Sequence, residues 1–394
     1  MKYAVVVPDG MADHPIERLG NRTPLEAAAT PNMDIVAASG RLGLVCHTPL
    51  VLPPGSDVAM LSVLGYDPTT CYTGRAPLEA ASMGIELGPS DVAFRCNLVT
   101  VDGDAMADHS AGHISNREAA VLVELLNEKL GSDTVRFYPG VGYRHLMVYR
   151  GPERLTAECT PPHDILDQPI ARHLPRGAGA DLLIRLMERS RGLLAGHDIN
   201  DVRIDLGENP ANMIWLWGGG TRPSLEPFAQ RYGKRGAVIA AVDLVRGIAA
   251  SVGLDIIKVE GATGYIHTNF AGKGQAAIEA LGTHDFAFVH IEAPDEASHQ
   301  GNIQAKVDAI EAVDEHIVGP LLAALASRGE YRLLVLPDHP TPLEVRTHVA
   351  EPVPFAYCGT GVGDRSGLSF TEPNAAQTGL LVEPGHLLLG TFLR

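Results

Sequence analysis

The sequence predicts an α/β protein in which a parallel sheet carries helices on both faces and a smaller α+β domain is inserted. Three strand-like runs are continuously apolar rather than alternating: Tyr3–Val7, Phe286–Ile291 and Arg332–Leu336. Acidic or turn residues follow each run. Continuous apolarity is typical of strands covered on both faces. Helical stretches lie between these runs, and a chain of 394 residues favours about two domains.

Three stretches of the C-terminal half have helical character: Asp243–Val252, Gly274–Leu281 and Gln304–Arg328. The last carries an apolar stripe at helical spacing, formed by Ile310, Val313, Ile317, Leu321 and Leu325. We interpret this stripe as core packing, without a functional role.

The middle of the chain differs from both ends. Strand-like pieces at Ala93–Val101, Thr134–Tyr138 and His145–Tyr149 flank helical stretches at Arg117–Leu130 and Ala178–Leu194. This order predicts an inserted α+β domain over residues 91–233. The sheet domain is then discontinuous and consists of residues 1–90 and 234–394.

Composition indicates a soluble globular protein, with 45% hydrophobic residues and a mean hydropathy of +0.04. Charged residues or prolines interrupt every apolar stretch before bilayer length, and the N-terminal apolar run is too short for a signal-peptide core. The five cysteines include no CxxC pair, which favours neither disulfides nor a zinc knuckle. We therefore expect a cytoplasmic protein.

The net charge of −16 opposes encounter with nucleic acid or an anionic membrane, so we expect neither as a partner. A small anionic substrate is compatible with this charge if local cations collect it.

Acids and histidines follow the predicted strands. Asp9 follows the first strand, and Asp338 and His339 follow a later one. Asp295 and His299 are four residues apart, so one helical turn places both on one face, where a carboxylate and an imidazole can share a metal. His348 lies nine residues after His339. Singly, each is equally well explained as a turn, a cap or a structural histidine; together they converge on the carboxyl edge of one sheet, where ligands of such sheets bind.

Ser56 follows Gly55 and precedes an apolar stretch that predicts a helix. A hydroxyl at a helix start lies among free backbone N–H groups, which suit a phosphoryl oxygen. Serine is a weak nucleophile that a bound metal can activate. If the metal-type residues are ignored, an ordinary N-cap serine explains the pattern better.

As an ordered set, the motifs of this chain resemble those of the archaeal type of cofactor-independent phosphoglycerate mutase, a branch of the alkaline phosphatase superfamily. The resemblance spans nearly the whole length and is carried by Pro8-Asp9-Gly10-Met11, Thr30-Pro31-Asn32-Met33-Asp34, Pro54-Gly55-Ser56-Asp57, Tyr72-Thr73-Gly74-Arg75, Gly261-Ala262-Thr263-Gly264-Tyr265, Pro294-Asp295 with His299-Gln300-Gly301, and Asp338-His339 with Thr341-Pro342. It implies an alkaline-phosphatase-like sheet domain.

The resemblance also implies two divalent metal ions, usually Mn²⁺ or Mg²⁺ and occasionally Zn²⁺ or Co²⁺. Ser56 matches the serine that is phosphorylated and also contacts the first metal. The other ligands of that metal match Asp9, Asp338 and His339, and the ligands of the second match Asp295, His299 and His348. Substrate contacts are expected from Arg75, His163 and Asp164 in or beside the inserted domain, which would close over the substrate.

The implied reaction is a step of glycolysis and gluconeogenesis, the interconversion of 3-phosphoglycerate and 2-phosphoglycerate through a phosphoserine. Two alternatives stay open on the same core: a metal-dependent phosphomonoesterase and a homoserine-kinase-like phosphotransferase. No GxxxxGK[ST] loop supports nucleotide binding.

Overall fold

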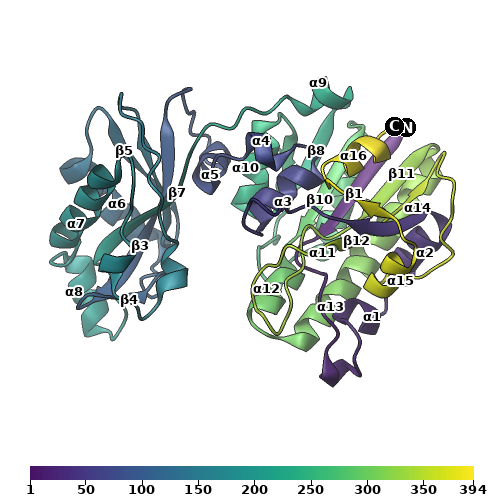
Figure 1. Ribbon diagram of the computed structural model, residues 1–394, viewed down its shortest axis with the longest axis horizontal. Coiled ribbons are helices and arrows are strands. Elements are labelled where there is room, and N and C mark those ends of the chain that lie inside the picture. Colours follow the sequence, from purple (N-terminus) through teal and green to yellow (C-terminus); the bar gives the residue numbers. More distant parts are fainter. The chain divides into compact units, whose positions relative to one another are not determined.

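The computed structural model describes all 394 residues, which form two compact units. Unit 1 consists of residues 1–72 and 224–394, and unit 2 of residues 73–223. Unit 2 is thus a contiguous insertion into a discontinuous unit 1 (Figure 1). No helix in either unit combines the length and the apolar composition that crossing a bilayer requires.

Unit 1 is built on an eight-stranded sheet whose strands are, in spatial order, β13 (Leu381–Val382), β2 (Arg41–Val45), β12 (Val353–Gly359), β11 (Tyr331–Val335), β1 (Lys2–Pro8), β10 (Phe286–Ile291), β8 (Gly236–Ile239) and β9 (Asp255–Ile257). The strands from β11 to β9 are parallel to their neighbours. β12 is antiparallel to both β11 and β2. The sequence predicted a parallel sheet and did not predict this antiparallel strand.

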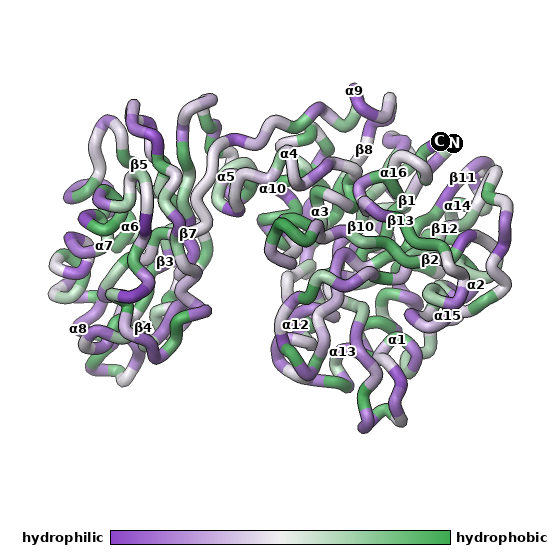
Figure 2. The backbone as a smooth tube through the Cα atoms, viewed as in Figure 1, coloured by the Kyte–Doolittle hydropathy of each residue, from purple (hydrophilic) through white to green (hydrophobic).

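Alternate residues of β1 face opposite sides of the sheet, and both sets are fully buried: Ala4 and Val6 on one side, Val5 and Val7 on the other. Helices therefore cover both faces of the sheet (Figure 1), and the most hydrophobic stretches follow its strands (Figure 2). The predicted α/β class with a largely parallel sheet is confirmed.

The helices of unit 1 are η1 (Glu17–Leu19), α1 (Pro24–Ala27), α2 (Pro31–Ser39), α3 (Ser56–Val63), α4 (Pro68–Cys71), α9 (Phe228–Tyr232), α10 (Asp243–Ser251), α11 (Phe270–Ala280), α12 (Ala293–His299), α13 (Ile303–Val313), η4 (Asp314–Val318), α14 (Gly319–Arg328), α15 (Glu372–Gln377) and α16 (Leu387–Phe392). The helix predicted over 304–328 comprises α13, one π-helical turn at η4, and α14. Its apolar stripe is buried, as the spacing predicts.

Unit 2 contains an antiparallel sheet of β3 (Val92–Asp102), β4 (Ala105–Asp108), β5 (Val135–Val141), β6 (Arg144–Tyr149) and β7 (Met213–Thr221). β3 is its central strand, pairing with β4, β6 and β7. The helices are α5 (Arg75–Ser82), α6 (Asn116–Leu130), α7 (Ala180–Leu194), α8 (Asp198–Asp205), η2 (Pro162–Ile165) and η3 (Ile170–Arg172).

The unit boundaries at 72/73 and 223/224 differ from the expected 90/91 and 233/234. At the first crossing, Ala76 and Ala80 of α5 pack against Ala93, Leu146 and Val148 of the unit 2 sheet, so this helix belongs to unit 2.

At the second crossing, Phe228 of α9 stacks on Phe286 of β10, with 4.8 Å between the ring centroids, which places residues 224–233 in unit 1. Contacts that are remote in sequence thus determine both boundaries.

Candidate active site

The first group of chemical side chains gathers where β1 and β11 end side by side. Asp9 directly follows β1, and Asp338 and His339 lie just beyond β11, its parallel neighbour. His339 Nε2 is 3.5 Å from Asp9 Oδ1 and 3.3 Å from Asp338 Oδ2. All three side chains are almost completely buried. Their ligand-type atoms lie close enough together to hold one metal ion, and we call them the first triad.

Ser56 joins this triad from α3. Gly55 occupies the N-cap position, so Ser56 is the first helical residue and its side chain is not used as a cap. Its Oγ instead lies 3.1 Å from His339 Nε2. The hydroxyl is therefore at a helix N-terminus, where free N–H groups favour an anion, and at the edge of the first triad.

The second triad consists of Asp295, His299 and His348. Asp295 and His299 lie one turn apart on α12, with 3.1 Å between Asp295 Oδ2 and His299 Nε2. His348, from the loop between β11 and β12, places Nε2 at 3.5 Å from Asp295 Oδ1 and 3.1 Å from His299 Nε2. The two triads adjoin, because the ring centroids of His339 and His348 are 4.2 Å apart.

The first triad suits a divalent cation electrostatically. Burial, followed by the nearby charges of Asp338, Glu292 and Asp295, raises the pKa of Asp9 well above its usual value. Asp9 Oδ1 and Asp338 Oδ2 are buried without a hydrogen-bond partner. A buried carboxylate without a partner is costly, and a cation among these oxygens would remove that cost. The mixed carboxylate and imidazole set suits Mn²⁺ or Zn²⁺ better than Ca²⁺.

In the second triad, the pKa of the carboxyl group is shifted in the opposite direction. Burial alone would raise the pKa of Asp295, but hydrogen bonds and charge from His299 and His348 outweigh it and hold that pKa well below its usual value. The hydrogen bond to Asp295 raises the pKa of His299 to about 9. Near neutral pH Asp295 is therefore ionised, as a metal ligand must be, whereas His299 holds a proton that an incoming ion would displace, because a ligating imidazole is neutral.

Two residues near Asp9, His290 of β10 and Glu292 just after it, were not predicted from the sequence, and Lys273 of α11 was expected to be a solvated surface cation. His290 Nε2 lies 2.7 Å from Asp9 Oδ2 and 3.6 Å from Glu292 Oε2. Lys273 is fully buried and its Nζ donates to His290 O at 3.1 Å. The available signal was a histidine and a lysine inside otherwise apolar elements, because such groups are seldom buried without a partner.

The three predicted substrate contacts all lie in unit 2. Arg75 begins α5 and pairs with Glu79, 3.2 Å from Nε to Oε1. His163 and Asp164 lie on η2, with 3.7 Å between His163 Nε2 and Asp164 Oδ1. Burial lowers the pKa of His163; Asp164 opposes this effect, while Arg95 and Arg75 add to it, so these charges share one electrostatic environment.

Arg95, His109 and Trp217, for which no role was predicted from the sequence, lie beside these residues. We call Arg75, Arg95 and His163, with their neighbours Asp164, His109 and Trp217, the cationic group of unit 2. The Arg95 guanidinium carbon lies 4.3 Å from the Trp217 ring centroid, and the side chain is almost fully buried. Burial lowers the pKa of Arg95 to about 10. The His163 ring meets Trp217 and His109 edge-on, at centroid distances of 5.3 and 6.1 Å. Arg95 Nε also lies 3.0 Å from Glu79 Oε2, so Arg75 and Arg95 share one carboxylate partner within the protein. Guanidinium groups beside aromatic rings typically bind carboxylates.

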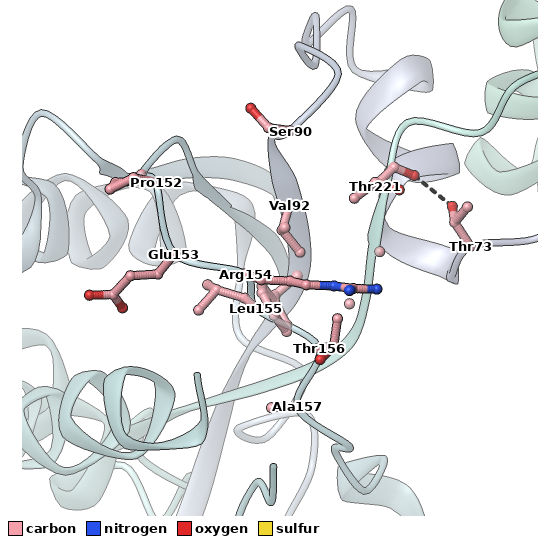
Figure 3. A pocket seen from close by; sticks show the side chains of 14 residues that line it. Thr73, Ser90, Val92, Pro152, Glu153, Arg154, Leu155, Thr156, Ala157 and Thr221 are labelled. Carbon is pink, nitrogen blue, oxygen red and sulfur yellow. Dashed lines mark hydrogen bonds between the residues drawn. The ribbon is translucent and has the colours of Figure 1, made fainter. Parts of the chain in front are cut away.

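Unit 2 also has a cavity of about 670 Å³, which includes none of the predicted site residues. Val92, Phe94 and Leu155 are among its apolar lining residues, and Figure 3 shows Arg154 extending beside Thr221 and Thr73. Because no residue of the triads or of the cationic group lines this cavity, we assign it no part in the chemistry.

The fold and the two triads define an α/β enzyme class in which candidate metal ligands converge at the carboxyl ends of parallel strands. Residues 37–200 match the family model of 2,3-bisphosphoglycerate-independent phosphoglycerate mutase. A probable mutase of this name from Geobacter sulfurreducens is 52% identical over 100% of both chains, and one from Methanosarcina mazei is 51% identical over 96% of both. The chain belongs to this cofactor-independent phosphoglycerate mutase family.

Solved structures agree with this assignment. A protein of Pyrococcus horikoshii matches with a TM-score of 0.83 and 30% identity, covering 100% of this chain and 96% of the other. The cofactor-independent phosphoglycerate mutase of Thermoplasma acidophilum matches with a TM-score of 0.67 and 27% identity, covering 100% and 99%.

Proposed function

We propose that this enzyme interconverts 3-phosphoglycerate and 2-phosphoglycerate, with Ser56 as the nucleophile and the two triads as ligands of two divalent ions. The observation that carries the proposal is the position of Ser56 Oγ, 3.1 Å from His339 at the edge of the first triad and at the start of a helix. The relatives of this chain are named for the same activity.

Asp9, Ser56, Asp338 and His339 would hold one ion, and Asp295, His299 and His348 the other, Mn²⁺ or Mg²⁺ being the expected ions. When bound, such ions neutralise the phosphate ester and lower the pKa of a coordinated hydroxyl. Without that neutralisation, an anionic nucleophile and an anionic ester would repel each other.

In the first step, Ser56 Oγ forms a bond to phosphorus while the bond from phosphorus to the 3-oxygen of glycerate breaks. The net proton transfer is from the serine hydroxyl to the leaving oxygen. In the second step, the 2-hydroxyl of glycerate attacks the phosphoserine, and the serine oxygen leaves and recovers a proton. The ester is thereby moved without consumption of a second substrate.

The cationic group of unit 2 would hold the glycerate between these steps. Arg75, Arg95 and His163 offer positive charge or hydrogen-bond donors to the carboxylate, and Asp164 can accept from a glycerate hydroxyl. We propose that unit 2 retains the glycerate and excludes water by domain closure, because water at the phosphoserine would make the enzyme a phosphatase.

The direct test is incubation of the purified protein with 3-phosphoglycerate and Mn²⁺. The proposal expects 2-phosphoglycerate as the product, with little free phosphate. Free phosphate as the main product would indicate a phosphomonoesterase. Turnover only with homoserine and a nucleotide triphosphate would indicate the homoserine-kinase-like alternative.

Ser56→Ala tests the nucleophile. It should abolish turnover and leave ion binding largely intact, because six protein ligands remain. Ser62→Ala is the matched control on the same helix, since Ser62 is buried and its hydroxyl bonds to His47, outside both triads. The control should lose stability but keep turnover. Full turnover in Ser56→Ala would contradict the assignment.

A further inference from the structure

Thr341 connects the two triads through one oxygen atom. It lies in the loop after β11, and its side chain is fully buried. Its Oγ1 donates to Asp295 Oδ1 of the second triad at 2.6 Å. The same Oγ1 lies 3.2 Å from Nδ1 of His339 in the first triad. This hydroxyl thus contacts one proposed ligand of each ion.

The directions of these two hydrogen bonds follow from the hydroxyl having a single proton. Because that proton goes to the Asp295 carboxylate, Oγ1 can only accept from His339, so Nδ1 of His339 must carry the imidazole proton. Nε2 then has a free lone pair directed toward Asp9, Asp338 and Ser56. This is the tautomer that can bind a metal through Nε2, and the partner of the other ring nitrogen normally selects it.

The backbone of Thr341 is fixed as firmly as its side chain. Thr341 N donates to Ala12 O at 3.2 Å, and the buried Nζ of Lys306 donates to Thr341 O at 3.0 Å. Lys306 Nζ also pairs with Asp13 Oδ2 at 2.7 Å. The carbonyl, the amide and the hydroxyl of one residue are all engaged, which leaves the hydroxyl little freedom to move.

Gly10 provides the space that this arrangement needs. It has a φ of +60°, and a Cβ at this position would lie 2.5 Å from both Thr341 Oγ1 and Asp295 Oδ1. A side chain there would therefore collide with both partners of the Thr341–Asp295 hydrogen bond. The turn after β1 therefore requires glycine at this position for the Thr341–Asp295 hydrogen bond to form.

We propose that Thr341 is a positioning residue that couples the two metal sites, selecting the metal-binding tautomer of His339 while it orients the carboxylate of Asp295. The inference rests on the proposed two-ion function and adds a residue outside the proposed sets of metal ligands and substrate contacts. Partners of this kind change metal affinity by about 10- to 100-fold when removed. Both sites should weaken together, because one hydroxyl serves a ligand of each.

The test compares Thr341→Val, which keeps the shape and removes the hydroxyl, with Thr341→Ser, which keeps the hydroxyl. Isothermal titration of chelator-treated protein with Mn²⁺ measures the number and the affinity of the sites. Thr341→Val should bind both ions about 10- to 100-fold more weakly. Thr341→Ser should stay close to wild type. Excess Mn²⁺ should restore most of the kcat of Thr341→Val, because the proposed role of the hydroxyl is to position metal ligands.

Ser190→Ala controls for the loss of a buried hydroxyl. Ser190 is fully buried in unit 2 and makes two hydrogen bonds, to Met187 O at 2.6 Å and from Ile214 N at 3.0 Å. This variant should lose stability without a change in Mn²⁺ binding. Thermal unfolding of each variant shows whether it is folded, and the Ser variant keeps the test informative if Val does not fold.

Wild-type affinity for both ions in Thr341→Val would overturn this inference and leave the proposed function standing. Weakening of only one ion in that variant would overturn the coupling. Fewer than two ions bound to the wild-type protein would overturn the proposed two-ion site, and this inference with it. Equal weakening in the Ser and Val variants would also contradict a role for the hydroxyl.

Discussion

Asp9 and Glu372 of unit 1 both have raised pKa values, and burial is the largest cause for each. For Asp9 the neighbouring carboxylates add to the effect of burial, whereas the neighbours of Glu372 oppose it. Glu372 accepts hydrogen bonds from Thr23 Oγ1 at 2.7 Å and from Asp13 N at 3.3 Å. These bonds and the charge of Lys306 oppose the shift, but burial still raises the pKa of Glu372 from 4.5 to about 7. Glu372 is therefore a structural acid that titrates near neutrality.

This titration predicts a pH dependence of stability. Between pH 4.5 and about 7, an unfolded chain has lost this proton while the folded protein still holds it. The folded state then binds more protons, so the free energy of unfolding falls as pH rises through this window. The loss attributable to Glu372 is at most about 3 kcal/mol, at roughly 1.4 kcal/mol per pKa unit.

Urea unfolding of wild type and Glu372→Gln at pH 5 and pH 7.5 isolates this effect, because other titrating groups are common to both. The difference between the two pH values should be smaller in the variant. An unchanged difference would show that Glu372 has an ordinary pKa.

At the scale of elements, two loops at the carboxyl edge of the sheet are joined by a buried ion pair. Met11 and Ala12, in the loop after β1, each form an isolated β-bridge with Pro340, in the loop after β11. Lys306 of α13 links both loops through Asp13 and Thr341, and Asp13 also accepts from Leu343 N. Helix α13 therefore holds together the loops that carry the first triad.

Removal of one partner of this ion pair should be more damaging than removal of both. Lys306→Met leaves the buried Asp13 carboxylate without its cation, which typically costs about 3–5 kcal/mol. Adding Asp13→Asn removes the uncompensated charge and should recover part of that loss. Chemical denaturation of both single variants and the double variant measures this coupling. Strictly additive losses would mean that the two charges do not stabilise each other.

The sequence predicts the strands that carry Asp9, Asp338 and His339, because each is a continuous apolar run followed by acidic residues. It also places Asp295 and His299 on one helical face. It does not predict that β12 is antiparallel, because apolar runs do not encode strand direction. His290 was missed because it lies within a mainly apolar strand, and the expectation that Lys273 is a solvated surface cation was wrong, because only the tertiary structure shows that it is buried and bonded to His290 O.

The cationic group of unit 2 also depends on contacts between residues that are remote in the sequence. Arg75 belongs to a turn-like motif that carries the family resemblance, and His163 follows a proline pair. Arg95 and Trp217 lie inside strands, and their contact depends on pairing between β3 and β7, which are more than a hundred residues apart. Long-range pairing is the information that a single sequence lacks.

The two units of the molecule have separate hydrophobic cores. The metal-type triads lie in unit 1, and both tryptophans of the chain, Trp215 and Trp217, are buried in unit 2. Tryptophan fluorescence therefore reports on unit 2, while far-UV circular dichroism reports on both units.

Ions that bind only to the folded unit 1 should stabilise that unit by mass action. We expect saturating Mn²⁺ to raise the midpoint of the circular dichroism transition more than that of the fluorescence transition. Asp9→Asn should remove most of this difference, because it removes a proposed ligand without changing unit 2. Equal shifts in both signals would indicate that the units unfold as one.

The proposed function depends on two divalent ions held by seven side chains from distant parts of the chain, Ser56 among them. Anomalous diffraction at the manganese absorption edge, from crystals grown with Mn²⁺, locates such ions directly. Two peaks per chain are expected, one among Asp9, Ser56, Asp338 and His339 and the other among Asp295, His299 and His348. A single peak, or peaks outside these residues, would rule out the two-ion site.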